Sequence, residues 1–309
     1  MIIDIKEEGK IELPCLITRC DKGKTTKGTP YLALTLEDSS GILDAKFWNL
    51  TDEQVDAYHV GMVVEATGDI IIHKNALQLR VRTLKEIADG DLTQFVRQAP
   101  MSKKEMKDEV EKYLVQVEDS SLFLITQTIL EEKEKEYYSY SAATKNHHNF
   151  VGGLAYHSLS MLKMAMKVCE LYPWLDKDLI ICGTLLHDVG KIEELSSPVL
   201  PEYTVEGNLI GHISLMGNYI DRISHQLKIE NEESILLLKH MILSHHGKTD
   251  FGSPVVPMIP EAEVLSTIDN LDARLYMMKQ SIDATQPGEF GPRVFALENR
   301  MIYRRKGKK

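Results

Sequence analysis

LIICGTLLHDVGK, residues 179–191, places a histidine and an aspartate directly after eight mostly apolar residues. An apolar run of this length is far shorter than the roughly 20 residues that cross a membrane, and it is typical of a helix inside a protein core. His187 and Asp188 would therefore lie where burial is strong. A buried charge requires a partner, and a metal ion suits both side chains. The stretch predicts a helical domain with a metal site in its interior.

Most histidines fall in the same part of the chain. Of the 11 histidines, 9 lie between residues 147 and 246, and imidazole is the commonest protein ligand of transition metals. The candidate ligands, each on or at the end of a predicted helix, are His157, His187, Asp188, His212, His245, His246 and Asp269. Because this set exceeds the needs of one catalytic metal and a carboxylate can bridge two ions, it predicts two divalent cations. Imidazole and carboxylate together favour Mn²⁺, with Co²⁺, Fe²⁺ and Zn²⁺ as alternatives, over Ca²⁺.

Residues from about 102 to 285 have the pattern of an all-α domain. Ser102 with Glu105 three residues later is typical of a helix start. Further helices are expected at 120–136, 153–171, 178–188, 208–225, 232–245 and 261–281. His225 and His240, which stand outside the ordered set, are expected to have structural or surface roles.

Residues 11–83 instead have the alternation of β-strands. YLALTLED at 31–38 and ILDAKFW at 42–48 each alternate apolar with other residues, and the turn DSSG joins them into a hairpin. A short polar helix and two more strands, near 62–72 and 76–83, follow. Five strands with a helix between the third and fourth are typical of an OB-fold, a small Greek-key barrel. Another small β-barrel is the alternative.

The same alternation selects three side chains on the outer face of the second and third strands. Tyr31, Lys46 and Trp48 lie there, where OB-folds bind oligonucleotides. Aromatic rings beside a cation suit sequence-tolerant binding of a single strand. The alternative is that Trp48 covers one end of the barrel.

The length and the net charge of the chain limit the number of domains and the kinds of partner that can be expected. A chain of 309 residues suggests about two domains. The net charge of −10 argues against non-specific coating of nucleic acid, although a local basic groove stays compatible with it. Four cysteines without a CxxC pair indicate reduced thiols, and the N-terminus does not have the pattern of a signal peptide, so a cytoplasmic protein without a membrane partner is expected.

The ordered set H…HD…H…HH…D resembles the HD-domain superfamily of metal-dependent phosphohydrolases. The YhaM family of bacterial 3′-to-5′ exoribonucleases, which also carries an N-terminal OB-fold, is more similar still. The strings that carry this resemblance are NHHNFVGGLAYHSLSM (146–161), GTLLHDVGKIEEL (183–195), GHI (211–213) and LSHHG (243–247). The resemblance covers nearly the whole chain. It implies a multidomain α+β protein with a five-stranded OB-fold barrel before an all-α HD-superfamily domain.

The resemblance also implies an activity and a division of the ligands. The activity is metal-dependent 3′-to-5′ hydrolysis of single-stranded RNA, and of single-stranded DNA as a second substrate, to nucleoside 5′-monophosphates. The first metal would be held by His157, His187, Asp188 and Asp269, and the second by Asp188, His212, His245 and His246, with Asp188 as the bridge. Two other functions stay open: a nucleotide or cyclic-dinucleotide phosphohydrolase, and a non-catalytic nucleic-acid-binding regulator.

Three further residues are candidates for contacts with the substrate. Asp188 and Lys191 are expected to be the catalytic residues. Lys191, about one turn after Asp188, would stabilise charge on a phosphate oxygen. A surface cation near a helix end is the alternative. His147 and His148 are candidate contacts to a phosphate or a base, with a plain polar loop as the alternative.

The expected domain plan has four parts. They are an OB-fold at 1–90, a helical connector at 91–140, an HD domain at 141–285 and a basic C-terminal tail at 286–309. RMIYRRKGKK, the last ten residues, holds six basic and no acidic side chains and is expected to be mobile. Whether the protein is a homo-oligomer stays open.

Overall fold

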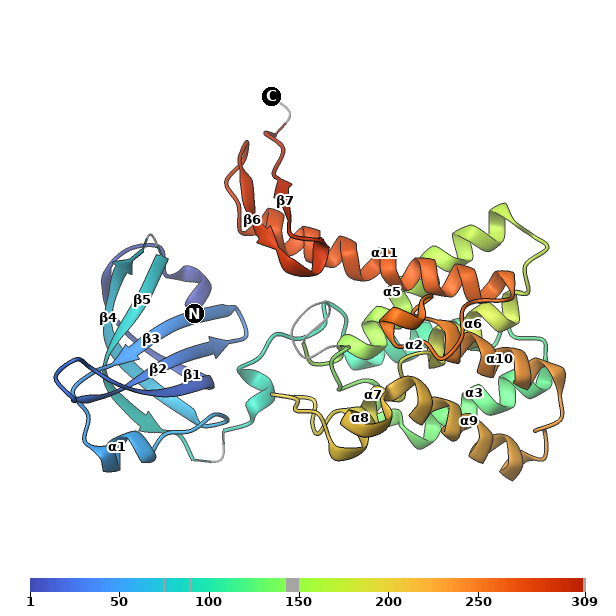
Figure 1. The fold of residues 1–309 in the computed structure, drawn as a ribbon, viewed down its shortest axis with the longest axis horizontal. Helices are drawn as coiled ribbons and strands as arrows, with labels where there is room; N and C mark the ends of the chain where they lie inside the picture. Colours follow the sequence, from blue (N-terminus) through green and yellow to red (C-terminus); the bar gives the residue numbers. More distant parts are fainter. Residues whose placement is uncertain (75, 89, 143–149, 308–309) are drawn as a thin grey trace. The chain divides into compact units, whose positions relative to one another are not determined.

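The computed structural model describes residues 1–74, 76–88, 90–142 and 150–307. The chain divides into two compact units, Met1–Gln98 and Ala99–Lys309, and each has its own hydrophobic core. The first is a closed β-barrel and the second is mainly helical (Figure 1). This confirms the predicted α+β fold class. Among the described residues no helix is both long enough and apolar enough to cross a bilayer.

The barrel has five strands and the topology of an OB-fold. Its elements are β1 (Gly9–Lys24), β2 (Pro30–Asp38), β3 (Gly41–Phe47), α1 (Asp52–Asp56), β4 (Val63–His73) and β5 (Ala76–Glu86). Neighbouring strands follow the order β1-β2-β3-β5-β4, and β1 pairs with both β2 and β4 to close the barrel. Only the β3–β5 pairing is parallel. The predicted strands and the helix between the third and fourth are all present.

The alternation in β2 and β3 determines which side chains enter the barrel. Leu34 pairs with Ala45 and Leu36 with Leu43, and all four side chains are buried. A one-residue shift in register would turn each of them outward, so the core fixes the register. The hairpin thereby keeps the opposite face of β2 and β3 free for the polar and aromatic side chains.

The second unit is built from ten helices within the described residues. They are α2 (Lys103–Leu114), α3 (Ser120–Glu132), α4 (Glu134–Tyr137), α5 (Gly153–Leu171), α6 (Lys177–Leu186), α7 (Lys191–Glu194), α8 (Val205–Ile210), α9 (His212–Leu227), α10 (Glu233–Ser244) and α11 (Pro260–Asp283). Helix α6 is central, because it contacts α2, α3, α5, α10 and α11, and its residues from 179 to 186 are all buried. Residues 91–140, expected as a connector, supply α2–α4 to the same core.

Two predicted helices have bounds that differ from the sequence pattern. The helix expected at 178–188 ends at Leu186, so His187 and Asp188 lie on the turn before α7. The helix expected at 208–225 breaks at Gly211, whose φ of 78° cannot continue a right-handed helix. His212 therefore becomes the first residue of α9. Both departures place a candidate ligand at a helix end.

The C-terminal segment contains a hairpin where a mobile basic tail was expected. β6 (Phe290–Val294) and β7 (Arg300–Tyr303) pair antiparallel, with a short 3₁₀ turn, η4 (Phe295–Leu297), between them (Figure 1). Both strands contact α11. Arg304 donates to the carbonyl oxygens of Ile282 at 3.2 Å and Thr285 at 2.7 Å. Carbonyl groups at the C-terminal end of a helix lack the regular helical partner four residues later, so a basic side chain is well suited to them.

Candidate metal centre and nucleic-acid face

Asp188 lies at the centre of the histidine cluster and is 2% exposed. Its Oδ1 is 3.6 Å from Nε2 of His212 and 3.7 Å from Nε2 of His245. Its Oδ2 is 3.3 Å from Nε2 of His187 and 3.9 Å from Nε2 of His157. The two oxygens of one carboxylate therefore face two different pairs of histidines.

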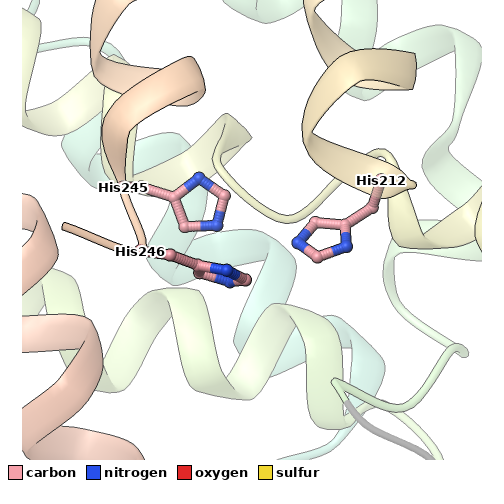
Figure 2. A group of neighbouring side chains, drawn as sticks. All are labelled: His212, His245 and His246. Atoms are coloured by element: carbon pink, nitrogen blue, oxygen red, sulfur yellow. The ribbon is translucent and has the colours of Figure 1, made fainter. Parts of the chain in front are cut away.

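The expected ligands form two groups around this carboxylate. One group is His157, His187 and Asp269, and the other is His212, His245 and His246. Within each group the candidate ligand atoms all lie within 4.8 Å of one another. Figure 2 shows the second group, in which His245 and His246 from the end of α10 converge with His212 from the start of α9. The structure thus brings all seven candidate ligands together.

Four buried atoms in the cluster have no hydrogen-bond partner among the described residues. They are Nε2 of His187, His212 and His245, and Oδ1 of Asp188. A buried polar atom without a partner costs about 1–3 kcal/mol, so four such atoms in one place fit a site that binds a cation. The opposite nitrogens are occupied, since Nδ1 of His187 lies 2.9 Å from the Thr184 carbonyl oxygen and that of His245 lies 2.7 Å from the carbonyl oxygen of residue 242. Nε2 is then left with its lone pair, and the donor set fits divalent transition-metal ions.

Two carboxylates behind the ligands were missed by the sequence analysis. Oδ2 of Asp272 lies 2.8 Å from Nδ1 of His157, and its other oxygen accepts from Ser160 at 2.7 Å. Oε1 of Glu194 lies 2.9 Å from Nδ1 of His212 and accepts from its backbone N–H at 3.0 Å. Such partners orient a metal-binding imidazole and raise its basicity.

The cluster shifts the pKa values of its members. Burial opposes ionisation of Asp188, but Lys191 and His187 outweigh it and hold the pKa of this carboxyl well below its usual range. Burial, with His246 nearby, holds the pKa of His245 well below its ordinary value. Burial would also lower the pKa of His157, yet its two carboxylate partners raise it to about 9. Ionised carboxylates and a neutral His245 are the forms that bind metal, and the negative charge around His157 attracts a cation.

Lys191 lies beside the bridging carboxylate. Its ammonium is 2.6 Å from Oδ2 of Asp188, and the side chain is largely buried. Burial disfavours the charged ammonium, but Asp188 outweighs burial and raises the pKa of Lys191. Lys191 also lines a cleft of about 570 Å³ together with His245, His246 and Asp269. A permanent cation therefore borders both the ligands and the space in front of them.

The three candidate side chains of the barrel also lie together. The rings of Tyr31 and Trp48 have centroids 4.5 Å apart, and the ammonium of Lys46 is 5.1 Å from the Tyr31 centroid. Trp48 is 39% exposed. A β-carbon on Gly23, the cross-strand neighbour of Tyr31, would lie 2.5 Å from the tyrosine ring, so glycine at this position leaves room for the ring where it lies. The outer face thus carries a fixed aromatic pair with a cation beside it.

Two further histidines of the helical unit, His225 and His240, have backbone partners of their own. Nδ1 of His225 lies 2.9 Å from the carbonyl oxygen of Asp221, and Nε2 of His240 accepts from the backbone of Met258 at 2.9 Å. His147 and His148 lie outside the described residues, so their proposed contacts stay predictions.

Family models match both units of the chain. The model for the HD domain matches residues 154–274, and a model described as an OB-fold nucleic acid binding domain, of the tRNA anti-codon type, matches residues 17–87.

Solved structures similar to this chain include the protein PriB from Ralstonia solanacearum, with 18% identity and a TM-score of 0.23, covering 25% of this chain and 97% of that one. A replication protein A heterotrimer bound to single-stranded DNA has 15% identity and a TM-score of 0.22, and the match covers 26% of this chain and 59% of that one. Asparaginyl-tRNA synthetase from Pyrococcus horikoshii has 14% identity and a TM-score of 0.21, and the match covers 42% of this chain and 32% of that one.

The domain matches agree with the geometry of each unit. The region that the HD model matches contains all seven candidate ligands, and the barrel carries the strand order of an OB-fold. The chain therefore joins an OB-fold nucleic-acid-binding domain to an HD domain, and the HD domain indicates a metal-dependent phosphohydrolase.

Proposed function

We propose that this protein is a metal-dependent exonuclease of single-stranded nucleic acid, in the manner of the YhaM family that it resembles. It removes nucleoside 5′-monophosphates one at a time from the 3′ end of single-stranded RNA and accepts single-stranded DNA as a second substrate. Two Mn²⁺ ions, or Co²⁺, Fe²⁺ or Zn²⁺, serve as cofactors, and the reaction takes place in the cytoplasm.

One observation carries the proposal. The two oxygens of Asp188 face different ligand groups, with Oδ1 3.6 Å from His212 and Oδ2 3.3 Å from His187. A carboxylate in this position could help to hold a cation with each group of histidines. Cations held by these residues would polarise the phosphate and lower the pKa of water in the site.

The protein side chains supply the rest of the chemistry. Hydrolysis forms a bond between the oxygen of water and phosphorus, breaks the bond from phosphorus to the 3′ oxygen of the preceding nucleotide, and transfers a proton to that oxygen. Lys191 faces the cleft and neutralises charge that develops on a non-bridging phosphate oxygen. Asp188 holds the lysine in place at 2.6 Å.

The barrel accounts for the preference for a strand over a mononucleotide. Tyr31 and Trp48 provide stacking surfaces and Lys46 provides a positive charge for the backbone. Every base has a π-face, so binding of this kind tolerates any sequence. A nucleotide or cyclic-dinucleotide phosphohydrolase has little use for such a face.

Digestion of a 5′-labelled single-stranded RNA with each divalent cation, resolved by length, tests the proposal. A ladder that shortens from the 3′ end, with nucleoside 5′-monophosphates as the other product, is expected in Mn²⁺. The Asp188→Asn variant should give no ladder, whereas Asp221→Asn, which alters only an exposed ion pair with Lys239, should match the parent protein. Single internal cuts, or hydrolysis of nucleoside triphosphates or a cyclic dinucleotide with the RNA left intact, would contradict the exonuclease.

A further inference from the structure

The cleft in front of the metal ligands extends well beyond them. Its near end is lined by Lys191, His245, His246 and Asp269, and its far end by Ala273, Arg274, Met277 and residues of the η4 turn, with Asn270 directly after Asp269 on α11. The volume of about 570 Å³ is within the range of about 300–1,000 Å³ that is usual for sites of small organic ligands. A phosphate at the metals would fill only the near end.

The far end presents an aromatic ring that the fold does not use. Phe295 is 85% exposed and lines the cleft, although large apolar side chains are normally covered. The next residue but one, Leu297, is completely buried and anchors the same turn. The Phe295 ring is therefore exposed to the cleft, while the buried side chain of Leu297 holds the backbone of the turn against the core.

Ion pairs hold this turn against α11. Arg274, which also lines the cleft, donates to both carboxylate oxygens of Glu298 at 2.8 and 3.0 Å. Arg300 pairs with the same carboxylate at 2.9 Å. Glu298 and Asn299 have φ values of 53° and 59°, a left-handed backbone that L-residues rarely adopt. Strained backbone of this kind persists where the surroundings determine it and is concentrated at binding sites.

We infer that the far end of the cleft is a subsite for the base of the terminal nucleotide, which stacks on Phe295 while its 5′ phosphate lies at the metal ligands. The inference rests on the proposed function and specifies its substrate contact. The exposed amide of Asn270 offers both a donor and an acceptor to the base edge. Because stacking accepts every base, the subsite selects for the presence of a base and not for its identity.

Two single strands that differ only at the 3′ terminus test the subsite. One ends in an ordinary nucleotide and the other in an abasic nucleotide, and kcat/KM is measured for the first cut in Mn²⁺. The parent protein should favour the strand with the base by about 5- to 140-fold, which corresponds to about 1–3 kcal/mol for one stacked base. Phe295→Ala should reduce this ratio to near one by slowing only the first strand, and Phe295→Trp should retain it.

Phe290→Ala is the matched control. Phe290 is also largely exposed, stacks on Tyr303 of the same hairpin, and does not line the cleft. In Phe290→Ala, the ratio of kcat/KM between the strand with the base and the abasic strand should equal that of the parent protein. An unchanged ratio in Phe295→Ala, or equal losses on both strands, would overturn the subsite.

A binding measurement separates this inference from the proposed function. Calorimetry should show that Phe295→Ala weakens binding of adenosine 5′-monophosphate by about 5- to 140-fold, the factor expected for one stacked base. The affinity for ribose 5-phosphate, which has no base, should not change. If neither strand is cut but this difference is found, the exonuclease proposal fails and the base subsite stands. If strands are cut and this difference is not found, the subsite fails alone.

Discussion

A β-carbon at Gly190 would lie 2.2 Å from the carbonyl oxygen of His212, so the turn after Asp188 is in direct contact with the start of α9. This contact brings the HD turn and the His212 imidazole to one place. The obstacle is backbone, which cannot rotate away as a flexible side chain would. Glycine is therefore required at position 190 because the two backbone segments approach so closely, and not because of its backbone angles.

Gly190→Ala should disrupt the metal centre. Overpacking of this kind costs about 1–3 kcal/mol and should displace His212 from the carboxylate it faces. We expect lower metal content by mass spectrometry and loss of most hydrolysis. Gly9→Ala, at a glycine with open space around its α-carbon, is the control and should change neither. Full metal content in Gly190→Ala would show that α9 can move without loss of the site.

Removal of metal should destabilise the helical unit. An ion that binds only the folded protein adds about 2.7 kcal/mol at a concentration 100 times its Kd, or roughly 5–11 °C in Tm for a unit of this size. Thermal unfolding after chelation should show this loss, and Mn²⁺ or Co²⁺ should reverse it. Ca²⁺ should restore little, because imidazole-rich sites suit it poorly. Equal recovery in Ca²⁺ would point to carboxylates alone as the ligands.

Asp272→Asn should weaken metal binding more than catalysis. Its carboxylate orients His157 from behind, at 2.8 Å. Loss of such a partner typically lowers metal affinity about 10- to 100-fold. The Mn²⁺ concentration for half-maximal rate should rise by this factor, while kcat at saturating Mn²⁺ stays close to that of the parent. Asp283→Asn, on the exposed end of the same helix, should leave both values unchanged. A fall in kcat at every Mn²⁺ concentration would place Asp272 among the reacting groups.

Lys191→Met should lower kcat more than affinity for RNA. Methionine keeps most of the buried volume and removes the charge, so the loss measures electrostatic stabilisation of the transition state. Removal of one such contact typically costs about 10²–10³ in kcat. Single-turnover rates and the Kd of a 3′-blocked strand separate the two effects. Lys239→Met, at a partly exposed lysine paired with Asp221, is the control. Weaker binding with an unchanged rate would reassign Lys191 to substrate capture.

The double variant Tyr31→Ala, Trp48→Ala should raise KM for a long strand and preserve kcat. Two lost stacking contacts of about 1–3 kcal/mol each weaken binding by one to several orders of magnitude. A dinucleotide too short to occupy both domains should be cut as by the parent. Tyr172→Ala, Trp174→Ala removes another aromatic pair, from the helical unit, and should affect neither substrate. Equal losses on long and short substrates would contradict a role of the barrel in binding.

The strands and the ligands could be predicted because each depends on a strong local pattern. Leu34 and Leu36 enter the barrel at the period of two that the sequence displays. The seven candidate ligands are polar side chains on or at the ends of largely buried helices, where a charge without a partner is most costly. Their order along the chain, together with its resemblance to the HD superfamily, selected them as candidates.

Features that depend on tertiary contact could not be predicted. Asp272 and Glu194 each stand three residues after a candidate, but acidic side chains at this spacing are common on solvated helices. The break at Gly211 depends on a backbone angle that glycine permits and does not require. In the C-terminal hairpin, Pro292 and a high basic content obscure the strand pattern, and its contact with α11 supplies the stability.

The order of the ligands along the chain has a consequence for biosynthesis. Asp269 contacts His157 from 112 residues further along the chain, on the last helix of the unit. A ribosome-bound chain completes its N-terminal barrel early, since domains fold as units during translation. The metal centre stays incomplete until α11 has left the exit tunnel, so the growing chain can hold the ions only when its synthesis is nearly finished.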